Sequence, residues 1–161
     1  MNKFETVKNI LVESNGIAKT AQFVEAGMST YDVANLCNKG LIVRIKNGYY
    51  SLPDKHNIPD EQIIAISLPE GIICMHSALF YYGYSDFTPR SFDIAIPRKS
   101  NRKIQTLPIA FNTYYVSDSI YDLGKTTGIF NAIELPIYNR ERTICDCFKH
   151  RSKLDNEIFN K

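Results

Sequence analysis

The chain of 161 residues has no tryptophan, no long apolar run and little excess of charge of either sign. A membrane-spanning helix needs ~20 consecutive apolar residues, and no stretch approaches that length, so we expect no membrane span. The net charge is +2, from 19 Lys and Arg against 17 Asp and Glu, which excludes a uniformly basic nucleic-acid-binding protein. Any contact with nucleic acid must therefore come from a local cluster of positive side chains.

The sequence also lacks the short motifs of common catalytic sites: it has no glycine-rich phosphate loop, no HExxH and no G-x-S-x-G. Five carboxylates could be imagined as a metal-dependent nuclease set, but their spacing resembles no nuclease signature and favours solvated or capping roles. They are Asp93, Asp118, Asp122, Glu134 and Asp146. We therefore expect a protein that is not an enzyme and that holds no cofactor.

The four cysteines are poorly placed for disulfide bonds. Cys145 and Cys147 are too close in sequence for an ordinary disulfide, which indicates a reducing compartment. With no signal peptide at its start, the chain is predicted to be cytoplasmic. Cys74 with His76, and Cys145 with Cys147 and His150, are spaced more tightly than the ligands of structural zinc sites. Small buried apolar roles are favoured for these cysteines, and no metal site is predicted.

The most informative stretch is residues 16–52, and it is preceded by an amphipathic helix predicted for residues 3–14. The inner face of that helix is Phe4, Val7, Ile10 and Leu11. Offsets of four and three then place three apolar residues on one stripe of a second helix, which ends at Gly27. These residues are Ile17, Ala21 and Val24.

The third predicted helix has a start signal, an apolar stripe and a polar face. Ser29 is a good N-cap, Asp32 can close a capping box with it, and Gly40 suits a C-terminal cap with positive φ. The apolar stripe is Val33, Leu36 and Cys37. At about 100° per residue, three uncharged hydrogen-bonding side chains lie on the opposite face. They are Tyr31, Asn35 and Asn38.

A basic β-hairpin is predicted directly after this helix. Two strands, 41–45 and 49–52, flank an Asn-Gly dipeptide, which is the strongest short hairpin signal. Lys39, Arg44 and Lys46 add three positive charges with no acid between them. A helix-turn-helix followed by such a hairpin is a winged helix, in which one helix enters the major groove and the hairpin lies over phosphates. A small helical domain whose polar face is only solvated is the alternative.

The rest of the chain predicts a second domain of mixed α and β structure, so the expected fold class is α+β. Composition marks residues 54–60 as a linker between domains 1–53 and 61–161. The expected helices are 60–68, 77–82, 142–150 and one from 154. The expected strands are 72–75, a half-buried 92–96, 107–116, and two within 119–139 that turn at 125–128.

Four cations gather in the loop after strand 92–96: Arg98, Lys99, Arg102 and Lys103. Beside a DNA-binding domain they predict a second phosphate contact, and a solvated turn is the alternative. In the helix 142–150, Thr143 is predicted to be the N-cap. Arg140, Arg142 and Asp146 are predicted to form structural ion pairs.

Three blocks of the sequence resemble the AbiEi-type antitoxins of abortive-infection, type IV toxin–antitoxin systems. The N-terminal stretch is similar to their winged helix. Residues 76–89, HSALFYYGYSDFTP, resemble the family's HSALxxYGLTD…P segment, and residues 141–146, ERTICD, resemble its ERTLVD helix start. The resemblance spans roughly residues 3–161. Ser85 stands where the family usually has Thr, and we expect the family's C-terminal helices to be cut short here.

The resemblance implies a repressor that binds inverted repeats in its own promoter, as a monomer in solution or a dimer on DNA. It also implies an antitoxin that counteracts a nucleotidyltransferase-like toxin encoded beside it, with no direct contact required. The DNA contacts that it implies are Lys19, Thr20, Thr30, Tyr31, Asn35, Lys39, Arg44, Lys46 and Tyr49. Asn38 on the same helix face and Asn47 in the hairpin complete the predicted interface.

Three other functions stay open on the sequence alone. The first is a winged-helix regulator whose C-terminal domain senses a small molecule. The second is an enzyme that acts on nucleic acid, and the third is a protein-interaction module that uses the winged helix as a docking surface.

Overall fold

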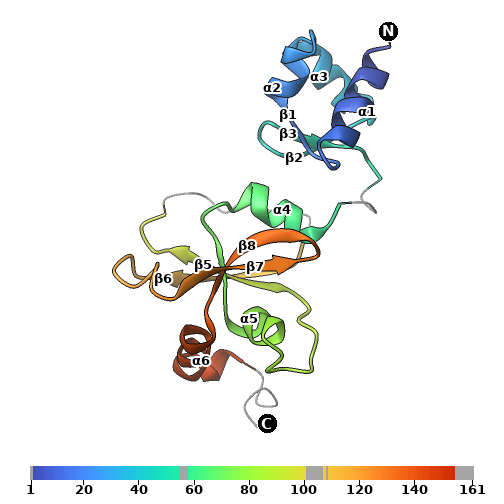
Figure 1. Ribbon diagram of the computed structural model, residues 1–161. Helices are drawn as coiled ribbons and strands as arrows, with labels where there is room; N and C mark the ends of the chain where they lie inside the picture. Colours follow the sequence, from blue (N-terminus) through green and yellow to red (C-terminus); the bar gives the residue numbers. More distant parts are fainter. Residues whose placement is uncertain (1, 55–57, 101–106, 108, 155–161) are drawn as a thin grey trace. The chain divides into compact units, whose positions relative to one another are not determined.

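The computed structural model describes residues 2–54, 58–100, 107 and 109–154 (Figure 1). Its architecture is α+β, as predicted: N-terminal helices with a small antiparallel sheet are followed by a mixed five-stranded sheet with helices. Contacts divide the described residues into two compact units. The first ends at Ile63 and also takes in Leu107, and the second begins at Ile64.

The first unit packs three helices and three strands around one apolar core. Its elements are α1 (Lys3–Glu13), β1 (Ala18–Lys19), α2 (Thr20–Glu25), α3 (Thr30–Asn38), β2 (Val43–Lys46) and β3 (Tyr49–Ser51). The buried core consists of Val7, Leu11, Ala18, Phe23, Met28, Val33, Leu36 and Ile42. Phe4, Ile10 and Cys37 pack against it from its edge, so the predicted inner faces of α1 and α3 are confirmed.

The predicted capping box and the predicted hairpin are both confirmed. Ser29 Oγ accepts a hydrogen bond from Asp32 N at 3.1 Å, and Asp32 Oδ2 accepts one from Ser29 N at 3.0 Å. The sheet order is β1-β3-β2, and Gly48 in the turn of the hairpin has a φ of 82°. A bulge between Arg44 and Lys46 shifts the register of the hairpin.

The second helix differs from its prediction. Residues 18–19 form the short strand β1, in which Ala18 lies opposite Tyr50 of β3, so α2 begins only at Thr20. Phe23 is fully buried, whereas Val24, which the sequence places on the apolar stripe of this helix, is 48% exposed. Local apolar spacing gave the wrong helix face because β1 is fixed by a strand that lies far away in the chain.

The second unit is built on a mixed sheet of order β6-β5-β4-β8-β7. Its elements are α4 (Asp60–Ser67, in this unit from Ile64), β4 (Ile72–Ile73), α5 (Met75–Tyr81), β5 (Phe92–Pro97), β6 (Phe111–Val116), β7 (Lys125–Phe130), β8 (Ile133–Tyr138), α6 (Arg140–Lys149) and the 3-10 helix η2 (Arg151–Lys153). The β5–β6 and β4–β8 pairs are parallel, and the β4–β5 and β7–β8 pairs are antiparallel. α5 and α6 lie on one face of the sheet and α4 on the other (Figure 1).

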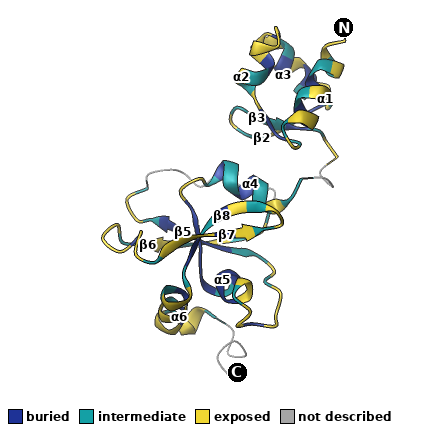
Figure 2. Ribbon diagram, in the orientation of Figure 1, coloured by how far each residue is buried: buried dark blue, intermediate teal, exposed yellow. Residues whose placement is uncertain are grey.

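β5 is buried on both faces, and the predicted half-buried strand is therefore wrong. Ile94 and Ala95 are both 0% exposed, and even Asp93 is only 5% exposed. Figure 2 shows the buried residues concentrated where the central strands pass between the helices. Helices on both faces of a sheet bury its central strands on both sides, which an alternating sequence pattern does not reveal.

The β7–β8 hairpin turns at Asn131 and Ala132, so the turn predicted at residues 125–128 is wrong. Both residues have positive φ, 52° and 65°, which is uncommon outside glycine. Gly128, which suggested the turn, lies inside β7. A Cβ there would come within 3.1 Å of the Tyr81 ring, so this glycine permits close packing rather than a turn.

α6 begins differently from its prediction but contains the predicted ion pair. Its N-cap is Asn139 rather than Thr143, because Asn139 Oδ1 accepts a hydrogen bond from Arg142 N at 2.9 Å. Thr143 is fully buried inside the first turns of the helix. Arg142 Nε lies 2.8 Å from Asp146 Oδ2, whereas Arg140 stacks on a tyrosine ring.

Candidate nucleic-acid interface

The polar face of α3 points to solvent. Tyr31 is 77% exposed, and Asn35 and Asn38 are exposed as well. Val33 and Leu36 point the other way and are buried in the core. Within the described part of the chain, no hydrogen bond ties the three polar side chains to the protein. The face therefore offers one phenol and two amides to a partner.

A second feature is a row of three side chains across the small sheet, one from each strand. The register places Lys19 of β1 and Lys46 of β2 on either side of Tyr49 of β3. The ammonium nitrogens of the two lysines lie 5.7 and 5.8 Å from the centroid of the Tyr49 ring. At this distance a cation is attracted to the ring face, so the aromatic ring holds two positive charges close together.

Hydrogen bonds fix this row to the helix pair. Thr20 N donates to Gly48 O at 2.9 Å, and the Thr20 hydroxyl donates to the same oxygen at 3.3 Å. Lys19 N donates to Gln22 Oε1 at 2.8 Å. The start of α2 is thus bonded to the turn of the hairpin, and the three strands hold the lysines in place.

Comparison with known families identifies this unit. Residues 5–53 match the family model described as a transcriptional regulator, AbiEi antitoxin. The first unit contains an AbiEi-type regulator domain. The resemblance is confirmed for these residues, and that of residues 76–89 and 141–146 stays a prediction because the match ends at residue 53. A comparison with curated proteins gave no match.

The AbiEi domain has every predicted DNA-contacting residue at its surface, although to different degrees. The exposed residues are Lys19, Thr30, Tyr31, Asn35, Asn38, Lys39, Arg44 and Asn47, and the half-buried ones are Thr20, Lys46 and Tyr49. The Arg44 guanidinium donates a hydrogen bond to Asn47 Oδ1 across the bulge of the hairpin. The Thr20 hydroxyl is likewise already used within the fold.

Sequence reasoning missed the lysine that neutralises the one acid of α3. Lys3 Nζ of α1 lies 2.7 Å from Asp32 Oδ1 in the first turn of α3. The hydrogen bond from Lys3, together with those from Ser29, lowers the pKa of Asp32 from its ordinary 3.8 to about 2. The ion pair thereby neutralises the carboxylate of Asp32, which lies at the N-terminal end of α3 beside its exposed polar face.

This low pKa predicts a specific loss of stability in acid. Because the pKa of Asp32 is lower in the folded state, its stabilising effect is complete above about pH 4 and disappears as the pH falls through about 2. We expect the melting temperature of the wild type to fall more steeply over that range than that of Asp32→Asn, measured by circular dichroism. Glu25→Gln, at an exposed position on α2, is the control and should keep the wild-type steepness. Parallel curves for the wild type and Asp32→Asn would contradict the prediction.

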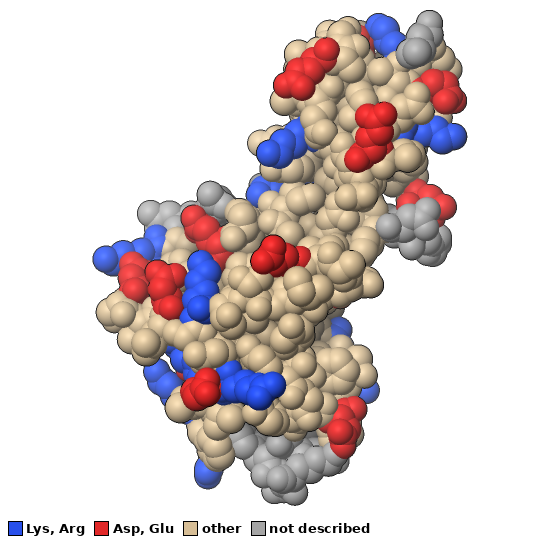
Figure 3. All heavy atoms as spheres, viewed as in Figure 1, with Lys and Arg blue, Asp and Glu red and all other residues tan. Residues whose placement is uncertain are grey.

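The predicted second phosphate contact is only partly described. Arg98 and Lys99 are exposed, and Lys99 Nζ lies 3.6 Å from Asp118. Arg102 and Lys103 lie outside the described residues, and so does the helix expected from residue 154, apart from Leu154 itself, which is extended. Figure 3 shows Lys and Arg interspersed with Asp and Glu on the visible face, so the charge there is mixed rather than uniformly basic.

Cys74 and Cys147 are buried and Cys37 is half-buried, whereas Cys145 is exposed, so the buried role expected for Cys145 is wrong. Burial raises the pKa of the Cys147 thiol to about 12 and raises that of Cys74 as well, so both stay protonated at neutral pH. In the described ranges, no group of three or more His, Cys, Asp or Glu side chains could hold a metal ion. No described helix is long and apolar enough to cross a membrane.

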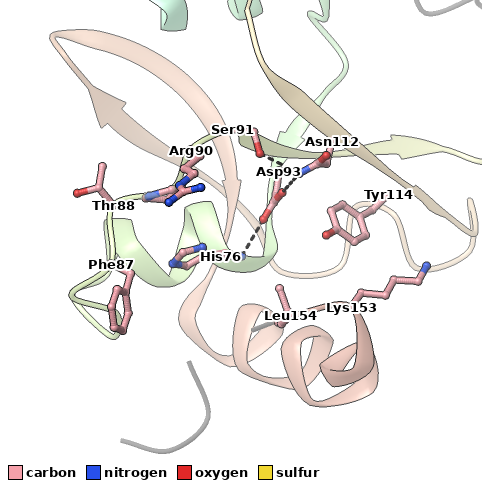
Figure 4. Close-up of a pocket in the computed structure, with 11 residues that line it drawn as sticks. His76, Phe87, Thr88, Arg90, Ser91, Asp93, Asn112, Tyr114, Lys153 and Leu154 are labelled. Atoms are coloured by element: carbon pink, nitrogen blue, oxygen red, sulfur yellow. Dashed lines mark hydrogen bonds between the residues drawn. The ribbon is translucent and has the colours of Figure 1, made fainter. Parts of the chain in front are cut away.

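Sequence reasoning also missed a cavity in the second unit. It has a volume of about 630 Å³ and lies beside Asp93 of β5 and His76 of α5 (Figure 4). It is assembled from α5, the loop before β5, β5, β6 and η2, and no periodicity of the sequence brings these segments together.

Proposed function

We propose that this protein is a DNA-binding transcriptional autorepressor and antitoxin of an AbiE-like, type IV toxin–antitoxin system. The observation that carries the proposal is the exposed face of Tyr31, Asn35 and Asn38 on α3, in a domain that matches the AbiEi regulators. The protein acts by binding rather than by catalysis.

The chemistry of the two surface features suits the two parts of a DNA duplex. An asparagine amide can form two hydrogen bonds with the N6 and N7 edge of adenine in the major groove, which makes Asn35 and Asn38 readers of sequence. Lys19 and Lys46 can neutralise phosphates and release counterions, which adds affinity without sequence preference. Two copies on an inverted repeat would place their α3 helices about one helical turn of DNA apart.

The antitoxin part of the proposal is supported by the family match and by the resemblance of residues 76–89 and 141–146. The expected partner of this antitoxin is a nucleotidyltransferase-like toxin encoded by a neighbouring gene. Expression of the neighbouring reading frame alone should stop growth, and co-expression of this protein should restore it. An Asn35→Ala variant expressed from an unrelated promoter separates the two roles, because it should lose repression and keep antitoxicity.

The repressor part is tested by gel shift on the DNA directly upstream of the gene. We expect a shifted band with that DNA at protein concentrations where a scrambled duplex of the same composition stays free. An equal shift of both duplexes, or of neither at low salt, would overturn the proposal and favour a protein-docking role for the winged helix.

The Lys19–Tyr49–Lys46 row predicts a distinct signature for Lys46→Ala. Removal of one phosphate contact should weaken binding to all DNA sequences alike and lower the slope of log K against log salt by about one. The slope is measured by fluorescence anisotropy over a salt series. Lys8→Ala, an exposed lysine on α1, is the matched control and should keep the wild-type slope. A loss limited to the operator sequence would contradict this role for Lys46.

One observation favours a second candidate function, a regulator whose C-terminal domain senses a small molecule. The cavity beside Asp93 has the size of a small-molecule site, which is typically about 300–1,000 Å³. Ligand binding there could accompany either DNA binding or antitoxicity.

A further inference from the structure

The cavity of the second unit combines a polar floor, of which Asp93 is buried, Tyr114 half-buried and Asn112 exposed, with a charged rim. Asp93 of β5 and two residues of β6, Asn112 and Tyr114, line its floor. Arg90 and Lys153 lie at its edge, and Figure 4 shows them on opposite sides of Asp93. All of these residues belong to one unit, so the cavity does not depend on how the two units are arranged.

Asp93 is bonded from two sides yet keeps capacity to accept more. Its Oδ2 accepts a hydrogen bond from His76 N at 3.1 Å, and its Oδ1 accepts one from Asn112 Nδ2 at 3.1 Å. The backbone of Ser77 also bonds to this carboxylate, and a carboxylate has about four acceptor sites, so about one is left for a partner. Anchoring the backbone of α5 at His76 explains why an acid is buried here, but it does not explain a cavity of about 630 Å³ beside it.

The rest of the floor is also rich in acceptors. Asn112 Nδ2 donates to Ser91 Oγ at 2.9 Å as well as to Asp93. With both amide hydrogens directed at the protein, Asn112 Oδ1 has no hydrogen-bond partner among the described residues. The Tyr114 hydroxyl is available too, and burial raises the pKa of Tyr114 to about 12, which keeps it a neutral donor or acceptor. The floor therefore matches a ligand part that carries several N–H or O–H donors.

The rim has the opposite character. Arg90 and Lys153 are exposed and carry two positive charges against the single carboxylate of Asp93, so the cavity favours an anion. The Phe87 ring, 48% exposed at the edge, offers an apolar surface on which a flat group can stack. Arginine and lysine are the side chains that most often bind phosphate groups in proteins.

We propose that this cavity binds a nucleotide, with the donor-rich base or ribose on the Asp93–Asn112 floor and the phosphates against Arg90 or Lys153. A mononucleotide joins these three features in one molecule: hydrogen-bond donors, an aromatic ring and an anion. The inference deepens the small-molecule-sensing candidate function and rests on it. It does not need DNA binding by the AbiEi domain.

Isothermal titration calorimetry of the full chain tests the inference with ATP, GTP, CTP and UTP as probes. Inorganic triphosphate and the four nucleosides are the partial ligands. We expect at least one nucleotide to bind more tightly than both its nucleoside and inorganic triphosphate. No binding of any nucleotide at millimolar concentration would overturn the inference, and so would triphosphate binding as tight as nucleotide binding, because the rim alone would then explain it.

Variants separate the floor from the rim. Arg90→Ala or Lys153→Ala should weaken nucleotide binding about tenfold or more and leave nucleoside binding unchanged, which identifies the phosphate contact. Arg151→Ala, an exposed cation on η2 that does not line the cavity, is the matched control and should bind as the wild type does. Nucleotide affinity unchanged by both rim variants would overturn the inference.

Asp93→Asn tests the floor and should weaken nucleoside and nucleotide binding alike. Because Asp93 also anchors α5, its melting temperature is measured beside the affinity, and the rim variants keep the inference testable if this variant does not fold. Gel shifts without added nucleotide test the DNA-binding proposal separately. If the wild-type protein binds its operator but binds no nucleotide, this inference alone is overturned.

Discussion

Replacement of Asn35 by alanine is expected to weaken binding to the operator by about 1–3 kcal/mol and to relax specificity at one base pair. The Asn35 side chain is exposed at the middle of the polar face of α3, where an amide can form two hydrogen bonds with one base. Alanine is a better helix former than asparagine, so the variant should fold at least as well as the wild type. Quantitative gel shifts on the operator and on all single-base variants of it measure both effects.

The matched control for this experiment is Asn9→Ala, which removes an exposed amide from α1. It should bind the operator with the wild-type affinity and the wild-type base preference. A loss of the same size on operator and random DNA for Asn35→Ala would show that α3 does not read bases. Tyr31 would then be the next residue on that face to test.

Phe23→Ala should lower the free energy of unfolding by about 3–5 kcal/mol, the usual cost of removing a fully buried aromatic ring from a core. Phe23 is 0% exposed and packs edge-on against Tyr50 of β3, with ring centroids 6.1 Å apart. It therefore joins the helices to the sheet that carries the lysine row, and the variant should lose DNA binding together with the fold of this unit. Urea unfolding followed by circular dichroism measures the change.

Val24→Ala is the matched control, because it distinguishes the face of α2 that the structure buries from the face that the sequence pattern predicts. The apolar spacing places Val24 on the apolar stripe of its helix, whereas the structure exposes 48% of Val24 and buries its neighbour Phe23. An exposed valine should change the free energy of unfolding by about 0.5 kcal/mol or less. A large loss of unfolding free energy for Val24→Ala, with a small loss for Phe23→Ala, would contradict the structure. It would show that α2 buries Val24 rather than Phe23.

The parts of the fold that could be predicted depend on short-range signals. Ser29 and Asp32 are three residues apart and form their capping box within one helical turn, and the Asn-Gly pair before Tyr49 defines its hairpin by itself. The parts that could not be predicted are set by distant segments. The pairing of Ala18 with Tyr50 interrupts an apparent helix, and Gly128 is a packing position that looks like a turn.

The candidate sites divide in the same way. The polar face of α3 follows from helical periodicity, so Tyr31 and Asn35 could be identified from spacing. The partner of Asp32 is Lys3 on another helix, and nothing in the local sequence of either residue indicates that pairing. The cavity beside Asp93 could not be predicted at all, because strand order and helix placement bring its walls together.

The row of Lys19, Tyr49 and Lys46 has a thermal consequence. Its three residues come from three different strands, so the row exists only while all three strands are paired. Under the proposed function, warming that melts this small sheet would release the promoter in a single cooperative step, and bound operator would raise the temperature at which that happens.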